Sequence, residues 1–149
     1  MQAKPIDSDQ FIRIVRPALE QPDAEELARL VEDNWTKDQL CELLTYGTVD
    51  ARKVVCLTLG LVGCMGCANC MCIALQDDDA VVRELAEHGL WSIWFRAGSP
   101  ESQGQFKRGL ELMNHGDHRR ALGAFNWAIE TDPNFAEAYN QRSIAHYML

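Results

Sequence analysis

The sequence predicts an all-α protein built from short repeated helical hairpins, and three observations predict it. Apolar residues recur at helical spacing through most of the 149 residues, and alternation of period two never persists. Two helical segments that start at Arg52 and Arg83 also share one residue pattern, which indicates an internal repeat. The apolar share of 47 % and the charged share of 24 % are typical of a folded chain.

The charge balance disfavours two classes of partner. With 22 acidic and 14 basic residues the net charge is −8, which would repel both nucleic acid and anionic membrane surfaces. The start of the chain is polar, without the apolar core of a secretory signal, and the most apolar stretch, Val54 to Val62, is too short to cross a bilayer. We therefore expect a soluble cytoplasmic protein whose six cysteines are reduced thiols.

The N-terminal region, residues 1–35, is expected to hold two helices. Phe11 to Leu19 forms one amphipathic stretch, in which Pro17 would produce a kink or a break. A second helix opens at Pro22-Asp23, with acidic residues in its first turn that complement the helix dipole, and ends at Asn34.

The region 36–98 is expected to hold four helices. Thr36 is the expected N-cap of a helix over Lys37 to Tyr46, and Gly47 is its expected stop. The next three helices are expected over Asp50 to Val62, Cys67 to Leu75 and Val81 to Phe95. A polar turn at Asp77-Asp78-Asp79 separates the last two, and Gly98-Ser99-Pro100-Glu101 then marks a stop, a cap and a new helix start.

The segments after Arg52 and Arg83 can be aligned residue by residue. Val55 lies over Ala86, and Leu59 over Leu90, so small and large apolar residues follow each arginine at the same spacing. An acidic turn starts each helix, Asp50 for the first and Asp77 to Asp79 for the second, and its carboxylate is expected to cap the helix. The arginine can reach a carboxylate of the adjacent repeat. This pattern resembles the short HEAT-like repeats that are also found in phycobiliprotein lyases.

A second repeat pattern occupies residues 99–149. From Ser102 to Phe135 the chain carries small, aromatic and turn residues at the spacing of a helix-turn-helix of 34 residues. These residues are Gly109, Leu112, Gly116, Asp117, Ala121, Phe125, Ala128, Asp132 and Pro133. We expect the two helices to cross closely at Gly109 and to turn at Gly116, and we expect Ala121 and Ala128 to leave room for a neighbouring helix. This pattern resembles the tetratricopeptide repeat (TPR), and Ala136 to Tyr147 resembles the first helix of a following, incomplete repeat. Together the two resemblances imply an α-solenoid. Residues 136–149 are expected either to cap the repeats or to belong to a longer TPR array of which this chain is a piece. We favour the second, because the apolar residues Ile144, Ala145, Met148 and Leu149 lack an obvious partner helix.

Two positions depart from the TPR pattern. Gln105 stands where a large aromatic residue is expected, with Phe106 beside it, and Arg108 stands where leucine is common. The exposure of Trp127, which lies between Phe125 and Ala128, is left open by the sequence.

The TPR resemblance implies a non-enzymatic scaffold or adaptor that binds a peptide or a partner helix on the concave face of the solenoid. The first-helix positions that would contact this partner are Gln103, Phe106, Leu110, Met113, Asn140, Ile144 and Tyr147. The HEAT-like resemblance leaves open a lyase or enzyme subunit that attaches a bilin chromophore. No catalytic residue set and no cofactor is indicated by the sequence.

The alternative of a metal site rests on four clustered cysteines, Cys64, Cys67, Cys70 and Cys72. On a helix these side chains would point in divergent directions and would not converge on one ion. We therefore expect buried thiols that act as small apolar residues.

Overall fold

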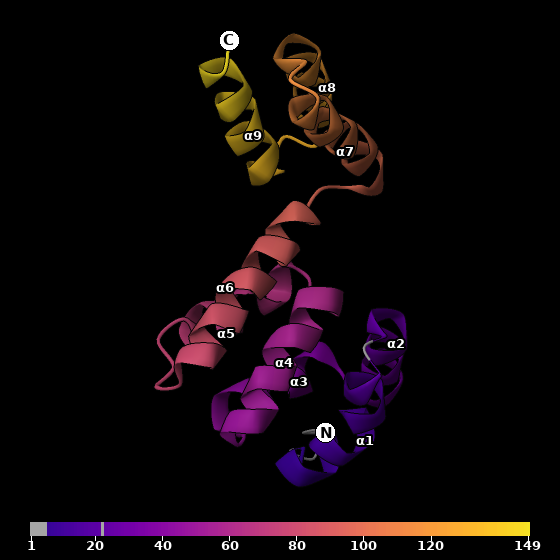
Figure 1. Cartoon of the computed structure of the whole chain (residues 1–149), viewed down its shortest axis with the longest axis vertical. Coiled ribbons are helices and arrows are strands. Elements are labelled where there is room, and N and C mark those ends of the chain that lie inside the picture. Colours follow the sequence, from indigo (N-terminus) through magenta and orange to yellow (C-terminus); the bar gives the residue numbers. More distant parts are fainter. Residues whose placement is uncertain (1–5, 22) are drawn as a thin grey trace. The chain divides into compact units, whose positions relative to one another are not determined.

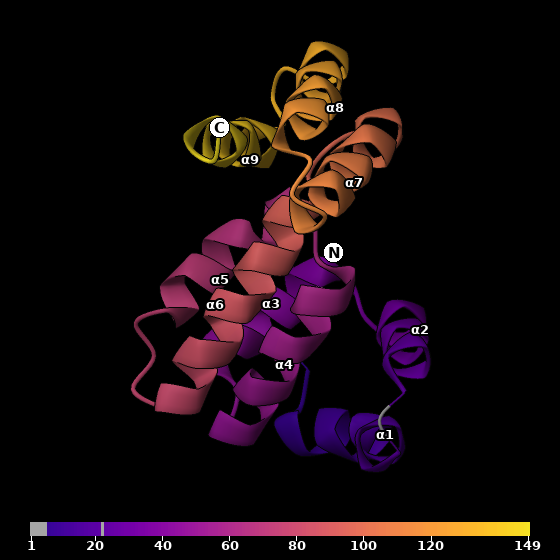
Figure 2. The ribbon, with the colours of Figure 1, turned by 45° about the horizontal axis from the view of Figure 1, so that its top comes forward.

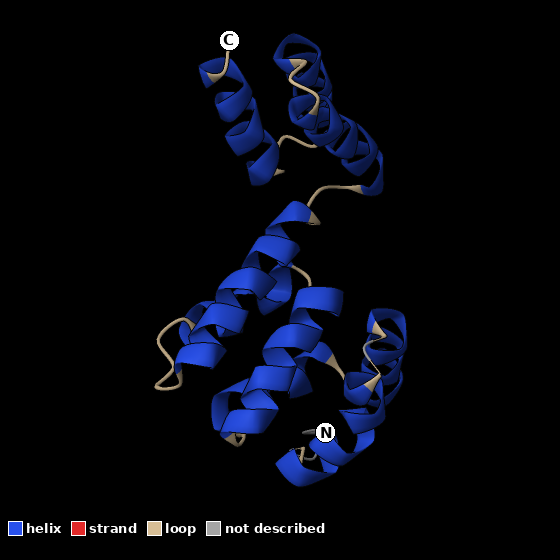
Figure 3. Ribbon diagram, viewed as in Figure 1, coloured by secondary structure: helices blue, strands red, loops and turns tan. Residues whose placement is uncertain are grey.

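The computed structural model describes residues 6–21 and 23–149, and this part of the chain is all helical (Figures 1 and 3), as the sequence predicts. The chain divides into two compact units, residues 1–93 and 94–149. The first unit contains α1 (Ser8–Glu20), α2 (Ala24–Asn34), α3 (Lys37–Tyr46), α4 (Val49–Val62), a 3₁₀ turn η1 (Met65–Cys67), α5 (Ala68–Ala74) and most of α6 (Ala80–Phe95). The second unit contains α7 (Pro100–Asn114), α8 (His118–Thr131) and α9 (Ala136–Tyr147).

The first unit is a stack of helical hairpins, which is the packing of an α-solenoid. The helix α3 packs against both α4 and α5. The helices α4 and α6 approach closely where two glycines meet, because a Cβ on Gly60 would lie 3.2 Å from the Cα of Gly89. The N-terminal helices α1 and α2 pack on α4, and the ring of Phe11 meets that of Trp35 edge-on at 4.9 Å between centroids.

Local capping chemistry sets most helix boundaries of the first unit. Thr36 and Gln39 form a complete capping box at the start of α3, and Gly47 follows its last residue. Asp23 caps α2, and Asp7 caps α1, which starts at Ser8 and continues without a break through Pro17 to Glu20. The predicted end of α2 at Asn34 and the predicted stop of α3 at Gly47 are confirmed. Pro22, part of the predicted start of α2, and residues 1–5 lie outside the described residues.

One predicted cap is wrong. The hydroxyl of Thr48, and not the carboxylate of Asp50, accepts a hydrogen bond from the N–H of Ala51 at the start of α4. Asp50 lies in the first helical turn instead. At the corresponding place before α6, the carboxylate of Asp79 does cap the helix and accepts from the N–H groups of Val81 and Val82 at 2.9 and 3.1 Å.

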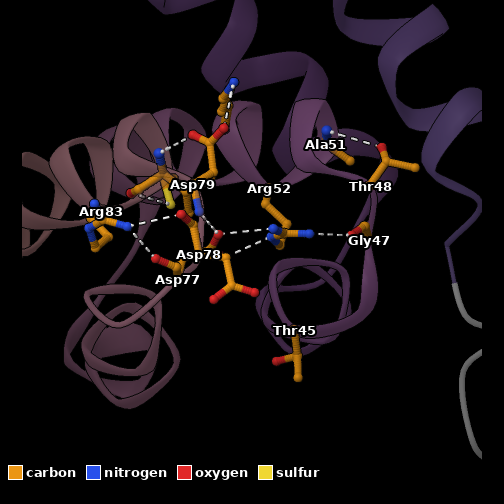
Figure 4. A network of polar contacts seen from close by, with 12 residues as sticks. Thr45, Gly47, Thr48, Ala51, Arg52, Asp77, Asp78, Asp79 and Arg83 are labelled. Atoms are coloured by element: carbon orange, nitrogen blue, oxygen red, sulfur yellow. Dashed lines mark hydrogen bonds and ion pairs between the residues drawn. The ribbon is translucent and has the colours of Figure 1, made fainter.

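Two cations on α4 bind the turn between α5 and α6 (Figure 4). Arg52 donates to both carboxylate oxygens of Asp77, at 2.7 and 2.9 Å, and to the carbonyl of Gly47 at 2.9 Å. The Nζ of Lys53 lies 3.3 Å from a carboxylate oxygen of Asp79. The predicted contact between the repeated arginine and a neighbouring carboxylate is therefore confirmed for Arg52. Arg83 instead donates to backbone carbonyls of the same turn, those of Asp77 and Asp78.

The Arg52–Asp77 pair should make stability depend on pH in the acid range. The hydrogen bond from Arg52 holds the pKa of the Asp77 carboxyl below its ordinary value. The folded state therefore binds this proton less tightly than the unfolded state, so the stabilisation is complete above the unfolded pKa of about 3.9 and is lost as the pH falls from there through the lower pKa of the folded state.

We expect Asp77→Asn to lower the free energy of unfolding by about 1.5–3 kcal/mol at neutral pH, because Arg52 loses a charged acceptor. The difference from the wild type should shrink below a pH of about 4. Urea denaturation at a series of pH values measures this, with the neighbouring Asp78→Asn as the control. Equal losses in the two variants, or a difference that does not change with pH, would contradict the assignment.

The second unit is a helix-turn-helix followed by a third helix. The helix α8 packs against both α7 and α9 (Figure 2). The turn after α7 is made by Gly116, which has a φ of +75°, and the N–H of Asp117 bonds back to the carbonyl of Leu112 at 2.9 Å. Ser99 caps α7 with Pro100 as its first residue, as predicted.

The core of the second unit is aromatic and closely packed. Phe106 lies among Phe95, Phe125 and Phe135, with ring centroids 5.6, 5.9 and 4.6 Å away. Ala121 and Ala128 are buried beside Phe125, which confirms their predicted role as small residues under a neighbouring helix. Gly109 lies against the Phe125 ring, so the predicted close crossing of α7 and α8 is also confirmed.

Candidate functional site

The candidate site with the most direct access to solvent is the outward face of α9. The exposed fractions are 41 % for Ile144 and 89 % for Tyr147, and Met148 and Leu149 beyond the helix are also exposed. Asn140, two turns before Tyr147, is exposed and donates from Nδ2 to the Glu137 carboxylate at 3.1 Å. The residues of α9 that enter the core, Ala138 and Ala145, lie on the opposite face. The predicted α9 residues therefore do form one solvent-facing surface.

The predicted residues on α7 are less accessible. Leu110 and Met113 are half-buried and pack against the core of the unit. The Nε2 group of Gln103 donates to the carbonyl of Phe95 at 2.9 Å, so this side chain is engaged within the protein.

Phe106 is a correction to the predicted partner-binding set. Only 1 % of its surface is exposed, and the ring fills the space between α7, α8 and the turn before α9. Its neighbour Gln105, at the expected aromatic position, lines the surface instead. The aromatic side chain that the core needs is thus supplied one residue later than the repeat pattern indicates.

The second unit also has a groove that was not predicted as a site. Between α7 and α8 a groove of about 450 Å³ is lined by both departures from the TPR pattern, Gln105 and Arg108, and by Arg120 and Trp127 of α8. Trp127 is 41 % exposed. The signal that could have found this groove was available, since two polar residues replace apolar ones one turn apart on the same face of α7.

The cysteine cluster does not form one site. Cys70 is joined by a disulfide to Cys41 of α3, with 5.6 Å between the Cα atoms, so it is not a free thiol ligand. This corrects the prediction that all six cysteines are reduced. The packing of α3 beside α5 brings together two residues 29 positions apart, which their spacing along the sequence cannot reveal.

The remaining thiols have different environments. Cys56 and Cys67 are buried, whereas Cys64 and Cys72 are exposed, so the prediction of buried thiols is right for Cys67 and wrong for Cys64 and Cys72. Burial raises the pKa of the Cys56 thiol to about 12 and also raises that of Cys67. A hydrogen bond from the backbone of Gly66 lowers the pKa of Cys64. In the part of the chain that the structure describes, no three His, Cys, Asp or Glu side chains are grouped so as to hold a metal ion.

The first unit has its own hollow beside the Arg52–Asp77 pair. It measures about 470 Å³ and is lined by Arg52, Asp77, Cys70 and residues of α3 and α5. Both ends of the ion pair are satisfied within the protein, because Arg52 also binds Gly47 and Asp77 also accepts from the N–H of Asp79 at 2.9 Å. This network holds the hairpins together, and it offers no unpaired group to a ligand.

No family model, curated protein or solved structure matches this chain. Among the described residues, no helix is both long enough and apolar enough to cross a membrane.

Proposed function

We propose that this chain is a non-enzymatic interaction scaffold that binds a peptide or a partner helix through its second unit. The proposal includes the assignment of residues 36–98 to HEAT-like repeats and of residues 99–149 to a TPR followed by the first helix of another repeat. Support comes from the stacked hairpins of the first unit and from the Gly109, Gly116 and Phe125 geometry of the second.

The observation that carries the proposal is the exposed apolar end of α9. Ile144 and Tyr147 lie at helical spacing on the face of α9 opposite to its core residues Ala138 and Ala145. Exposed apolar side chains grouped in this way are typical of protein-binding surfaces, and aromatic residues contribute most of the binding energy at such surfaces. Asn140, one turn before Ile144, adds a polar group that can orient a peptide backbone.

The proposal also includes the cytoplasmic location that the sequence favours. There the Cys41–Cys70 disulfide would meet a reducing thiol pool, because glutathione and thioredoxin keep cytosolic thiols reduced. The link between α3 and α5 would then depend on the redox state of the cell.

The test starts from peptides that are selected from a random display library for binding to the immobilised full chain. The affinity of these peptides is then measured for variants that carry a charged substitution. For peptides that bind α9, Ile144→Asp and Tyr147→Asp should each weaken binding at least about tenfold, as measured by fluorescence polarisation. The matched control is Tyr46→Asp, because Tyr46 is the last residue of α3 and is 82 % exposed. Selected peptides whose affinity changes equally with all three variants, or with none, would contradict the proposal.

A further inference from the structure

The groove between α7 and α8 is open because of the residues that line it. Gln105 and Arg108 of α7 line it with polar side chains, at the two positions where the TPR pattern has apolar ones. On α8, Gly123 lines the groove without a side chain, and the space beside it is open, since a Cβ there would meet no atom within 4 Å. The helices are nevertheless held together, because Gly109 lies directly against the Phe125 ring. The groove therefore lies on a hairpin whose two helices are closely packed, and it does not result from loose packing.

Two guanidinium groups line the groove from different helices. Arg108 of α7 is exposed, and within residues 6–21 and 23–149 its side chain makes no hydrogen bond or ion pair. Arg120 of α8 meets only Asp117, at 3.4 Å and in an exposed i,i+3 pair of the kind that contributes little. Glu111, one turn beyond Arg108, makes no ion pair with it. Both arginines thus keep donors available to a ligand.

The net charge of the second unit differs from that of the whole chain. The second unit carries as many basic as acidic residues, so all of the net charge of −8 belongs to the first unit. The basic residues of the second unit are Arg96, Lys107, Arg108, Arg119, Arg120 and Arg142, and the acidic ones are Glu101, Glu111, Asp117, Glu130, Asp132 and Glu137. The two arginines of the groove are a local concentration of positive charge within this neutral unit.

Apart from the amide of Gln105, the rest of the lining is apolar. Trp127 presents an exposed indole, and Leu112 and Ala124 complete the apolar part of the surface. A guanidinium pair binds carboxylates with directed, charge-assisted hydrogen bonds, and an indole face packs against aromatic or aliphatic side chains. The amide of Gln105 can donate to or accept from a peptide backbone.

We propose that this groove binds a protein segment in which an acidic residue is adjacent to an aromatic or large aliphatic residue. The acidic carboxylate binds Arg108 and Arg120, and the apolar side chain packs on Trp127. The site is separate from the α9 surface, so it gives the second unit a second binding surface. Charge complementarity identifies the ligand as acidic. Nucleic acid is disfavoured because the first unit, with its net charge of −8, repels a phosphate chain.

The test uses the full chain and two synthetic peptides that differ only in charge, one with the core Asp-Phe-Asp and one with Asn-Phe-Asn. The acidic peptide should bind at least about tenfold more tightly by fluorescence polarisation. Arg108→Gln and Arg120→Gln should each reduce that affinity by about tenfold. The control is Arg119→Gln, which removes the same charge from the residue that precedes Arg120 on α8 and should leave affinity unchanged. The indole N–H signal of Trp127, assigned with Trp127→Phe, should shift in the NMR spectrum on addition of the acidic peptide.

Four outcomes would overturn the inference. They are equal affinity for the two peptides, an Arg119→Gln loss as large as that of Arg108→Gln, no binding of the acidic peptide at about 1 mM, and its displacement by a single-stranded oligonucleotide. Tyr147→Asp keeps this proposal separate from the previous one. It should leave binding of the acidic peptide unchanged while it weakens peptides that bind α9.

Discussion

Replacing Gly109 by alanine is expected to destabilise the second unit by about 1–3 kcal/mol, because the added methyl group overpacks a closed helix crossing. A Cβ at this position would lie 2.7 Å from Cδ1 and 2.8 Å from Cζ of Phe125. The ring cannot move away freely, since it is fully buried and packs against Phe106.

The same substitution elsewhere in α7 should have the opposite sign. Gly104 is exposed, and a Cβ there would meet nothing within 4 Å. Gly104→Ala should therefore stabilise the unit by about 0.5–1 kcal/mol, through the better helix propensity of alanine.

Urea denaturation followed by circular dichroism measures both changes, and hydrogen exchange should localise the Gly109→Ala effect to α7 and α8. Two variants with effects of the same sign would show that the crossing is not closely packed at Gly109.

Removing the Cys41–Cys70 disulfide is expected to have the largest effect in the first unit. Cys41→Ser should lower the free energy of unfolding by about 2–4 kcal/mol under oxidising conditions, because the unfolded chain regains the entropy of a loop with 29 residues of separation. In the presence of dithiothreitol the wild type and the variant should become nearly equal in stability.

Thiol titration provides an independent check of this link. The unreduced, denatured protein should react at Cys56, Cys64, Cys67 and Cys72, and after reduction Cys41 and Cys70 should react as well. Cys72→Ser is the control, because Cys72 is an exposed free thiol on the same helix as Cys70. A wild-type stability that does not respond to the reductant would refute the disulfide as a stabilising link.

The helix ends were predictable from the sequence because they depend on neighbouring residues. The Thr36 cap, the Ser99-Pro100 start and the Gly116 turn each satisfy backbone groups within a few residues. The prediction that Asp50 caps α4 failed, and the reason is also local. Both residue types can accept the hydrogen bond, and only the start of α4 at Val49 selects Thr48.

The candidate surfaces were only partly predictable. Asn140, Ile144 and Tyr147 are exposed on one face of α9, because i, i+4 and i+7 share one side of a helix, and their role in binding a partner stays a prediction. Repeat spacing put Phe106 on the binding surface, although its ring lies in the core. Spacing alone does not show whether the helix face at a given turn meets solvent or another helix, and at Phe106 the rings of Phe125 and Phe135 cover it.

By itself, the sequence determined that the chain is helical, where most of its helices begin and end, and which glycines lie at a turn or a close crossing. These features follow from backbone hydrogen bonding and from the volume of side chains near one another in the chain. Only the tertiary structure decided that Cys41 meets Cys70, that Arg52 binds Asp77 and not another carboxylate, and that Arg108, Arg120 and Trp127 share one groove. Those contacts join residues of different elements, so they exist only once the helices have packed.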